Sequence, residues 1–239
     1  MRSFQIECGN LVIEIHCVYE YTLNRCAKFI CAEKAADIVI EPSFSEYKSF
    51  KPAFEKMSEE YTEYMLIFSL LCEKVLDCGG VFIHSSVISV DNKGYAFLAR
   101  SGVGKTTQTL LWKDYFKDRA RIINGDKPLL TISDSMVYAS GTPWCGKESF
   151  SENETVPLNA LYFIERSDEN FAECITSHEA LEKLLKQFLI PHSGNENIQN
   201  ALKVADAIIK SVPIFRLHCN TDISAVKVAY DIANYGGIE

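Results

Sequence analysis

Apolar and polar residues alternate in four short runs near the start of the chain, a pattern that is typical of β-strands. The runs are separated by Gly-Asn, polar or charged breaks and read FQIEC, LVIEIHCV, CAKFICA and ADIVIE. This pattern favours an antiparallel arrangement. Apolar positions then recur at helical spacing over residues 54–76, after Pro52 and before Gly79-Gly80, which predicts one amphipathic helix.

Strand and helix patterns alternate through the rest of the chain. VFIHSSVISV predicts a strand, DNKG a tight hairpin turn, and YAFLA a strand that enters a glycine-bearing loop. Thr176 and Glu179 form a capping pair that begins a helix, and Pro191 ends it. Further helices are expected at 105–116, near 196–211 and near 222–234. Further strands are expected at RIIN, at LLTI and MVYA paired across the turn SDS, at ALYFIE and at PIFRLHC.

The order of these elements, strands first and then strands interleaved with helices, predicts a mixed α/β fold. We expect antiparallel strands and one helix in residues 1–78 to pack beside a core of residues 79–239, as a separate region or as part of one integrated domain. A chain of 239 residues, 47% of them hydrophobic, can bury a core of this size. No internal repeat or flexible linker interrupts the pattern.

Charge and composition argue against several kinds of partner. A net charge of -8 and a pI near 5.2, with no block of basic residues, argue against nucleic acid. No apolar stretch reaches the roughly 18 residues that a membrane-spanning helix requires. We therefore expect a cytoplasmic protein with no membrane partner. Its nine cysteines include no Cys-x-x-Cys pair, so we expect reduced and mostly buried thiols.

The segment ARSGVGKT, residues 99–106, matches the Walker A pattern G-x-x-x-x-G-K-[ST] except at its first position, where alanine replaces glycine. A strand is expected before it and a helix after it, so backbone N–H groups and the positive helix end would cradle phosphate groups. Gly102 and Gly104 would let the backbone bend closely. Lys105 would reach the β and γ phosphates, and Thr106 would ligate magnesium. We expect ATP and Mg2+ as cofactors, bound by Ser101, Gly102, Val103, Gly104, Lys105, Thr106 and Thr107.

Two side chains outside this loop are candidates for chemistry. Asp126 follows the strand RIIN, where a carboxylate at a strand end would serve a magnesium nucleotide site. The alternative is that Asn-Gly-Asp is a simple turn. His84 lies on the strand before the loop strand, in VFIHSSV. It is either a residue that contacts phosphate and moves a proton, or a packed core histidine.

A histidine on a strand, a hairpin, a strand leading into SGVGKT, a helix and an acidic strand end together resemble the catalytic domain of HPr kinase/phosphorylase. More broadly, the chain is similar to the phosphoenolpyruvate carboxykinase-like P-loop fold, including peptide serine kinases that act on lasso-peptide precursors. The resemblance covers residues 80–235, and its specific part is 84–130. It implies a P-loop nucleotide-binding mixed sheet, with His84 as the active-site histidine, residues 99–106 as the phosphate loop, and Asp126 as the metal-linked or proton-accepting acid.

The chain departs from this family in three respects. Gly125 precedes Asp126 where the family usually has two adjacent acids, so one acid would do both tasks or another acid would contribute. The arginine- and glycine-rich signature of the phosphorolytic reaction is missing, which argues against dephosphorylation. The chain is also much shorter than a phosphoenolpyruvate carboxykinase, which argues against that activity.

The segment GTPWCGKE, residues 141–148, stands where that signature would be. Trp144 offers a stacking face and Lys147 a charge for phosphate, so the segment is a lid or substrate wall, or Trp144 plugs the core. Cys145 has no histidine near it in sequence, which argues against a nucleophile. Arg100 and Arg166 are either phosphate clamps or solvated surface residues.

Together these features favour an ATP- and Mg2+-dependent kinase that transfers the γ-phosphoryl group to a hydroxyl, expected to be serine, of a protein, peptide or small molecule. Asp126, His84 and Lys105 would carry the catalysis, and Thr106 and Asp126 would hold the metal. An ATP-binding regulatory module with little chemistry and a simple ATPase are the alternatives. The residues leave open which acceptor is used and whether the chain forms a homo-oligomer.

Overall fold

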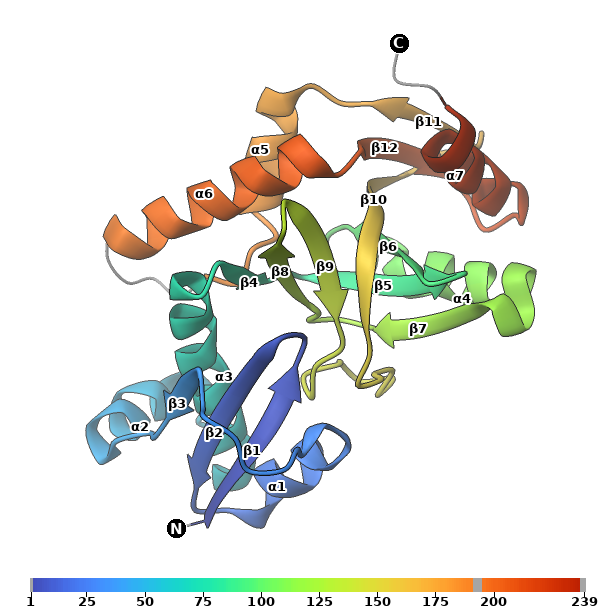
Figure 1. Ribbon diagram of the computed structural model, residues 1–239. Helices are drawn as coiled ribbons and strands as arrows, with labels where there is room; N and C mark the ends of the chain where they lie inside the picture. The colour runs from blue at the N-terminus through green and yellow to red at the C-terminus, as the bar shows by residue number, and fades with distance from the viewer. Residues whose placement is uncertain (1, 191–194, 237–239) are drawn as a thin grey trace.

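The computed structural model describes residues 2–190 and 195–236, and it contains two β-sheets (Figure 1). The smaller sheet is built from the N-terminal residues. Its strands β1 and β2 pair in antiparallel fashion, but β3 runs parallel to β2, so the expectation of a fully antiparallel region was wrong in part. The chain returns through a helical crossover between β2 and β3, which allows parallel pairing. The strands are β1 (Arg2–Cys8), β2 (Leu11–Cys17) and β3 (Ile38–Ile40).

Helical segments surround the smaller sheet. The run CAKFICA is not a strand, because it contains the end of a helix and a 3-10 turn, and its buried residues Cys26 and Phe29 have helical spacing. The long amphipathic helix α3 is confirmed, and it begins after Ser58, whose side chain accepts the N–H of Tyr61. The segments are α1 (Glu20–Cys26), η1 (Ala27–Phe29), α2 (Phe44–Phe50), η2 (Lys51–Phe54) and α3 (Glu59–Asp77).

The larger sheet is mixed and curled. Its strand order is β4-β8-β9-β10-β6-β5-β7, with β12 beside β10 and β11 at the outer side of β12. The C-terminal half of β10 runs parallel to both β6 and β12. The strands are β4 (Gly80–Phe82), β5 (Ser85–Val90), β6 (Lys93–Leu98), β7 (Ala120–Asn124), β8 (Leu129–Ser133), β9 (Met136–Ser140), β10 (Thr155–Arg166), β11 (Phe171–Cys174) and β12 (Ile214–Cys219).

The run VFIHSSVISV forms two strands rather than the single strand expected. The chain changes sheet partners at His84, because β4 pairs with β8 whereas β5 pairs with β6 and β7. The His84 N–H donates to the Gln187 carbonyl, and the Ser85 N–H donates to the Asp126 carbonyl at 3.1 Å. These bonds replace ladder bonds at the break, and the second fixes the break beside Asp126.

Helices cover both faces of the larger sheet (Figure 1). Ala96 and Leu98 of β6 pack in the cluster that contains α5 and α6, whereas Tyr95 and Phe97 pack in the cluster that contains α4 and α7. Successive residues of a strand point to opposite faces, so β6 is buried on both sides. The helices are α4 (Lys105–Phe116), η3 (Lys117–Arg119), α5 (Ser177–Leu185), α6 (Asn195–Ser211) and α7 (Ser224–Tyr235).

The predicted cap of α5 is present, since the Thr176 hydroxyl accepts the N–H of Glu179 at 3.2 Å. The predicted end at Pro191 lies outside the described residues.

A core cluster joins the smaller sheet and α3 to Phe82, Leu129 and Trp144 of the later chain. The division of the chain at residue 78 stays a prediction.

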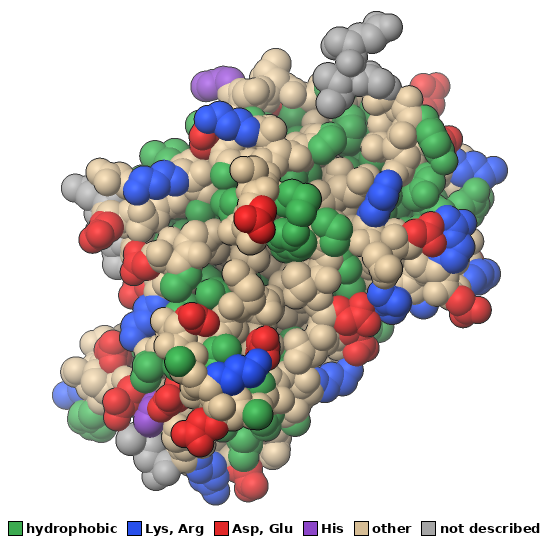
Figure 2. Space-filling view, viewed as in Figure 1, with side chains coloured by type: hydrophobic (Ala, Val, Ile, Leu, Met, Phe, Trp, Pro, Cys, Tyr) green, Lys and Arg blue, Asp and Glu red, His purple; other side chains and the backbone are tan. Residues whose placement is uncertain are grey.

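The surface matches the acidic composition. On the face shown in Figure 2, Lys and Arg side chains are interspersed with Asp and Glu rather than gathered into a basic patch. Within residues 2–190 and 195–236, no helix combines the length and apolar character needed to cross a membrane.

Candidate functional site

The glycine-bearing loop connects the end of β6 to the start of α4. Gly102 has a φ of 79° and Gly104 a φ of 142°, conformations that L side chains rarely adopt. The loop is closed by a bond from the Val103 N–H to the Arg100 carbonyl at 3.3 Å. These two glycines therefore allow the chain to turn sharply from the strand into the helix.

The N-terminus of α4 faces the open side of this loop. A helix hydrogen bond at this end runs from the Gln108 N–H to the Gly104 carbonyl at 2.9 Å. The N–H groups of Lys105, Thr106 and Thr107 lie ahead of that bond, at the positive end of the helix dipole. Local geometry thus leaves unpaired N–H groups at a helix end, an arrangement that commonly binds anions.

A cavity of about 480 Å³, here called the loop cavity, lies against this helix end. It is lined by the three residues expected to be catalytic and by all the expected phosphate-binding residues except Val103, which lines the neighbouring cavities. A further wall comes from residues 146–148. The lining residues are His84, Ser101, Gly102, Gly104, Lys105, Thr106, Thr107, Gly125, Asp126, Gly146, Lys147 and Glu148.

Lys105 and His84 are in direct contact in the loop cavity. The Lys105 ammonium is 3.0 Å from His84 Nε2 and donates to the Ala99 carbonyl at 3.1 Å. Burial lowers the pKa of Lys105, the charge of Lys127 acts in the same direction, and Asp126 opposes both. Lys105 as a whole is only 9% exposed, and it lines the loop cavity.

Asp126 is positioned by the buried residue Asn124 at the end of β7. The Asn124 side-chain oxygen accepts the N–H groups of Asp126 and Lys127, at 2.9 and 2.8 Å. These bonds shape the turn that follows the strand. The structure contains the expected turn, and this turn presents the carboxylate to the cavity, whereas the role of Asp126 as a metal-linked or proton-accepting acid stays a prediction.

The Asp126 carboxylate is flanked by basic groups on both oxygens. Oδ1 is 3.4 Å from His84 Nε2, and Oδ2 is paired with the Lys127 ammonium. Burial by itself would raise the pKa of Asp126, but hydrogen bonds from His84 and Lys127 lower it to about 2. Asp126 is therefore ionised throughout the neutral range.

His84 Nε2 contacts both a cation and an anion. It must be unprotonated to accept a hydrogen bond from Lys105, and it must carry a proton to donate one to Asp126. The His84 side chain is 30% exposed, so it is not a fully packed core residue. The geometry places the His84 imidazole at the junction of the two charges.

Gly125 explains why this chain has a single acid at the strand end. A Cβ built there would lie 3.3 Å from the Cys145 carbonyl oxygen and 3.3 Å from Cβ of Phe150. A side chain at this position would therefore push against the segment that closes the cavity. The segment itself brings a second carboxylate, Glu148, to the cavity wall.

Trp144 fixes one end of that segment in the core. Its ring is 2% exposed and stacks on Tyr64 of α3, with centroids 5.6 Å apart and planes 21° apart. The indole N–H donates to the Tyr64 carbonyl at 3.4 Å. The interpretation of Trp144 as a core plug is confirmed, and a substrate-stacking role for this ring is wrong because the ring is enclosed.

The other half of the segment reaches the cavity. Gly146 has a φ of 79°, and a Cβ there would lie 3.0 Å from Cβ of Asp126, so glycine permits the close approach. The Gly125 N–H donates to the Phe150 carbonyl at 2.9 Å, and the Asn124 amide donates to the Thr142 carbonyl at 3.2 Å. The wall is thereby tied to the same turn that presents Asp126. Sequence reasoning missed Glu148, because no local pattern marks it.

The remaining candidates from the sequence have other surroundings. Burial raises the pKa of the Cys145 thiol, which argues against a thiolate nucleophile at neutral pH. Arg100 is exposed. Arg166 donates from Nε to the Val103 carbonyl at 3.1 Å and from Nη2 to the Gly102 carbonyl at 2.5 Å. Arg166 therefore braces the loop itself.

The donor atoms of the cavity suit magnesium. No group of three or more His, Cys, Asp and Glu side chains is placed to hold a metal within the described part of the chain. Thr106 and Asp126, the two expected ligands, line the same cavity and offer oxygen atoms. Magnesium prefers oxygen and is commonly held by one or two protein groups together with phosphate oxygens and water. The residues therefore fit a magnesium nucleotide.

Comparison with known proteins gives only a distant likeness. No protein-family model and no curated protein matches the chain. Among solved structures, the Hpr(Ser) kinase/phosphatase from Coxiella burnetii is similar over 65% of this chain and 95% of that chain, with 8% sequence identity and a TM-score of 0.35. At this level of similarity, the site rests on its own geometry.

Proposed function

We propose that this protein is an ATP- and Mg2+-dependent phosphotransferase that moves the γ-phosphoryl group to a hydroxyl, with serine of a protein, peptide or small molecule as the expected acceptor. One observation carries the proposal. His84, Lys105 and Asp126, which lie far apart in sequence, line one cavity with a glycine loop and the N-terminus of α4. Phosphoryl transfer depends mainly on positioned positive charge of this kind.

Each group has a separate task in this proposal. The N–H groups at the start of α4 and the Lys105 ammonium bind phosphate oxygens and offset charge that develops during transfer. Thr106 and Asp126 hold magnesium, which when bound neutralises phosphate charge. His84 links Lys105 to Asp126 and holds or releases a proton at Nε2.

The hydroxyl group of the acceptor loses its proton during transfer, so a base is needed to take it. Asp126, besides holding the metal, is one candidate for this base, and Glu148, which lines the same cavity, is the other. The segment 146–148 therefore forms the wall nearest to the expected acceptor. The Asn124 amide also donates to the Thr142 carbonyl at the start of the segment 141–148, which would hold acceptor and acid in fixed relation.

The test is transfer of labelled γ-phosphate to a pool of serine-bearing peptides, compared with release to water. Asp126→Asn should bind ATP within an order of magnitude of the wild type and lose turnover, because it keeps the shape and removes the charge. Asp118→Asn, an exposed carboxylate of η3, is the matched control and should behave as the wild type.

The alternatives predict different results in the same assay. Firm ATP binding without transfer to peptides or small hydroxyl compounds would favour the regulatory module, and release to water alone would favour an ATPase. A protein that binds no ATP would contradict the proposal as a whole.

A further inference from the structure

A second cavity adjoins the glycine loop on the side away from His84. It measures about 480 Å³ and lies at the carboxyl ends of β10 and β12, so we call it the strand-end cavity. Gly102, Gly104 and Thr107 line both this cavity and the loop cavity. The two spaces therefore meet at the start of α4.

We propose that the strand-end cavity binds the nucleoside, base and ribose together, of the triphosphate whose phosphates occupy the loop cavity. This inference rests on the proposed function. It assigns a binding site to residues at the ends of β10 and β12 that the phosphate site does not use. A volume of this size is in the range of pockets that hold small ligands.

The direction of the bound molecule follows from the placement of charge. The terminal phosphate belongs beside Lys105 and His84, which lie toward β5 and β7. The opposite end of the triphosphate then leaves across Thr107, a residue of α4 that lines both cavities. There the parallel strands β6, β10 and β12 present their carboxyl ends, where ligands of open α/β sheets bind.

Gln108 of α4 forms the inner wall of the strand-end cavity. Its side chain lines the strand-end cavity and is 2% exposed. Its amide nitrogen donates to the Asn220 carbonyl at 3.1 Å, which fixes the orientation of the amide. Oε1 is left without a hydrogen-bond partner in the described residues. Oε1 is itself enclosed by protein atoms, so Gln108 contributes to this cavity by holding the Asn220 turn in place.

Hydrogen bonds within the protein fix the rim of the strand-end cavity. The Asn220 amide donates to the Asp168 carbonyl at 2.8 Å, and the Asn220 N–H donates to Asn170 Oδ1 at 2.8 Å. These bonds hold the turn after β10 against the turn after β12. The exposed Asp168 side chain lies on this rim, where a carboxylate can accept hydrogen bonds from ribose hydroxyls.

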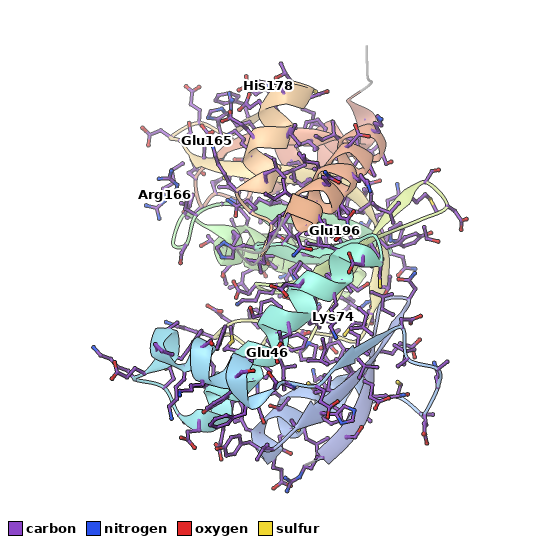
Figure 3. The ribbon with its side chains drawn as sticks, turned by 90° about the vertical axis from the view of Figure 1, so that its left-hand side faces the viewer. Glu46, Lys74, Glu165, Arg166, His178 and Glu196 are labelled. Carbon is purple, nitrogen blue, oxygen red and sulfur yellow. The ribbon has the colours of Figure 1, made fainter. Side chains whose placement is uncertain are left out.

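Arg166 forms the wall nearest to the glycine loop. Its two bonds to loop carbonyls hold the guanidinium at the edge of the sheet, where Figure 3 shows it beside Glu165 at the end of β10. A planar guanidinium held in this way offers a stacking face to a base. The same residue would then brace the phosphate loop and support the nucleoside.

A third cavity, of about 690 Å³, lies between the loop and α5 and is the competing location. Arg100 and Lys186 line it, but no residue of α4 does. It meets the loop cavity at Ser101 and Gly102 but not at the start of α4. We call it the α5 cavity and use it as the control site in the experiment below.

The experiment compares ATP with inorganic tripolyphosphate, which carries the phosphates without a nucleoside. Thr221→Trp places a large ring at the rim of the strand-end cavity, and Lys186→Trp does the same in the α5 cavity; both positions are exposed. By calorimetric titration, Thr221→Trp should weaken ATP binding about tenfold or more and leave tripolyphosphate binding unchanged. Lys186→Trp should leave both unchanged.

Asp168→Asn is the second variant, because it alters one carboxylate without filling space. It should weaken binding of ATP but not of tripolyphosphate, with an unchanged unfolding midpoint. Unaltered ATP affinity in both Thr221→Trp and Asp168→Asn, or loss of ATP affinity only in Lys186→Trp, would overturn the inference. Both outcomes differ from failure of the proposed function, in which the wild type binds neither ATP nor tripolyphosphate.

Discussion

Two segments face each other across the loop cavity, and they are built in opposite ways. Residues 99–107 present backbone N–H groups and one ammonium, and their shape comes from two glycines and a helix start. Residues 141–150 owe their position to a tryptophan buried against α3 and to hydrogen bonds with Asn124. The first segment is charged and takes its shape from its own contiguous sequence, whereas the second is held in place by contacts with residues far from it in the sequence.

Because of this difference, we expect mutations in the two segments to affect different properties of the protein. A change in the glycine loop should affect ligand binding with little effect on folding, because the loop contributes few apolar contacts. A change at the anchor of the opposite wall should affect stability first. The following predictions separate the two walls, beginning with the largest expected effect.

Lys105→Ala should abolish tight ATP binding, with a loss of affinity of about 100-fold or more, because it removes a point charge aimed at the phosphates. The fold should stay intact. Calorimetric titration measures the affinity, and Lys227→Ala, an exposed lysine of α7, serves as the control with unchanged affinity. An unchanged affinity in Lys105→Ala would remove the nucleotide from this loop.

Trp144→Ala should lower the free energy of unfolding by about 3 to 5 kcal/mol, the usual cost of emptying a large buried aromatic site. Trp144→Phe keeps a ring against Tyr64 and should lose much less. Urea denaturation measures both values. A loss below about 1 kcal/mol for the alanine variant would show that the wall does not depend on this anchor.

His84→Ala should slow phosphoryl transfer by roughly 100-fold, equivalent to about 2.7 kcal/mol, as loss of a positioned proton-transfer or electrostatic group commonly does. Stability should fall only modestly, because the side chain is 30% exposed. Turnover is measured per folded molecule, together with the unfolding midpoint. A large drop in the midpoint with normal turnover would instead identify His84 as a packing residue.

The charge of Asp126 should make stability depend on acid pH. Its pKa is about 2 in the folded protein, below the value of about 3.9 in an unfolded chain, so ionised Asp126 stabilises the fold above about pH 4. That contribution, at most about 2.6 kcal/mol, is lost as the pH falls from 4 toward 2. The difference in unfolding free energy between wild type and Asp126→Asn should shrink over that range. A difference independent of pH would contradict the ion contacts.

The sequence predicts the two walls unequally for a physical reason. The glycine loop, α4 and the strand before it form a contiguous pattern, so residues 101–107 could be assigned before any tertiary contact was known. Asp126 could be predicted as a candidate from the sequence because it follows a short apolar strand. Glu148 could not be predicted in this way, because its position depends on the packing of Trp144 against Tyr64. Tyr64 lies 80 residues before Trp144 in the sequence.

Errors in the fold arose where a pattern was ambiguous or where pairing was distant. Cys26 and Phe29 fit a strand run by composition, yet their spacing also suits a helical turn, and burial of both on one side favours the turn. The parallel pairing of β2 with β3 depends on a crossover that no local signal describes. The break at His84 depends on its bond to Gln187, more than a hundred residues later.

The most direct test of the account is a crystal structure with a non-hydrolysable ATP analogue and Mg2+. We expect the terminal phosphate beside Lys105 and His84, the metal between Thr106 and Asp126, and the nucleoside at the ends of β10 and β12. Analogue bound away from the glycine loop, for example in the groove beside Phe44 and Tyr47, would contradict the account.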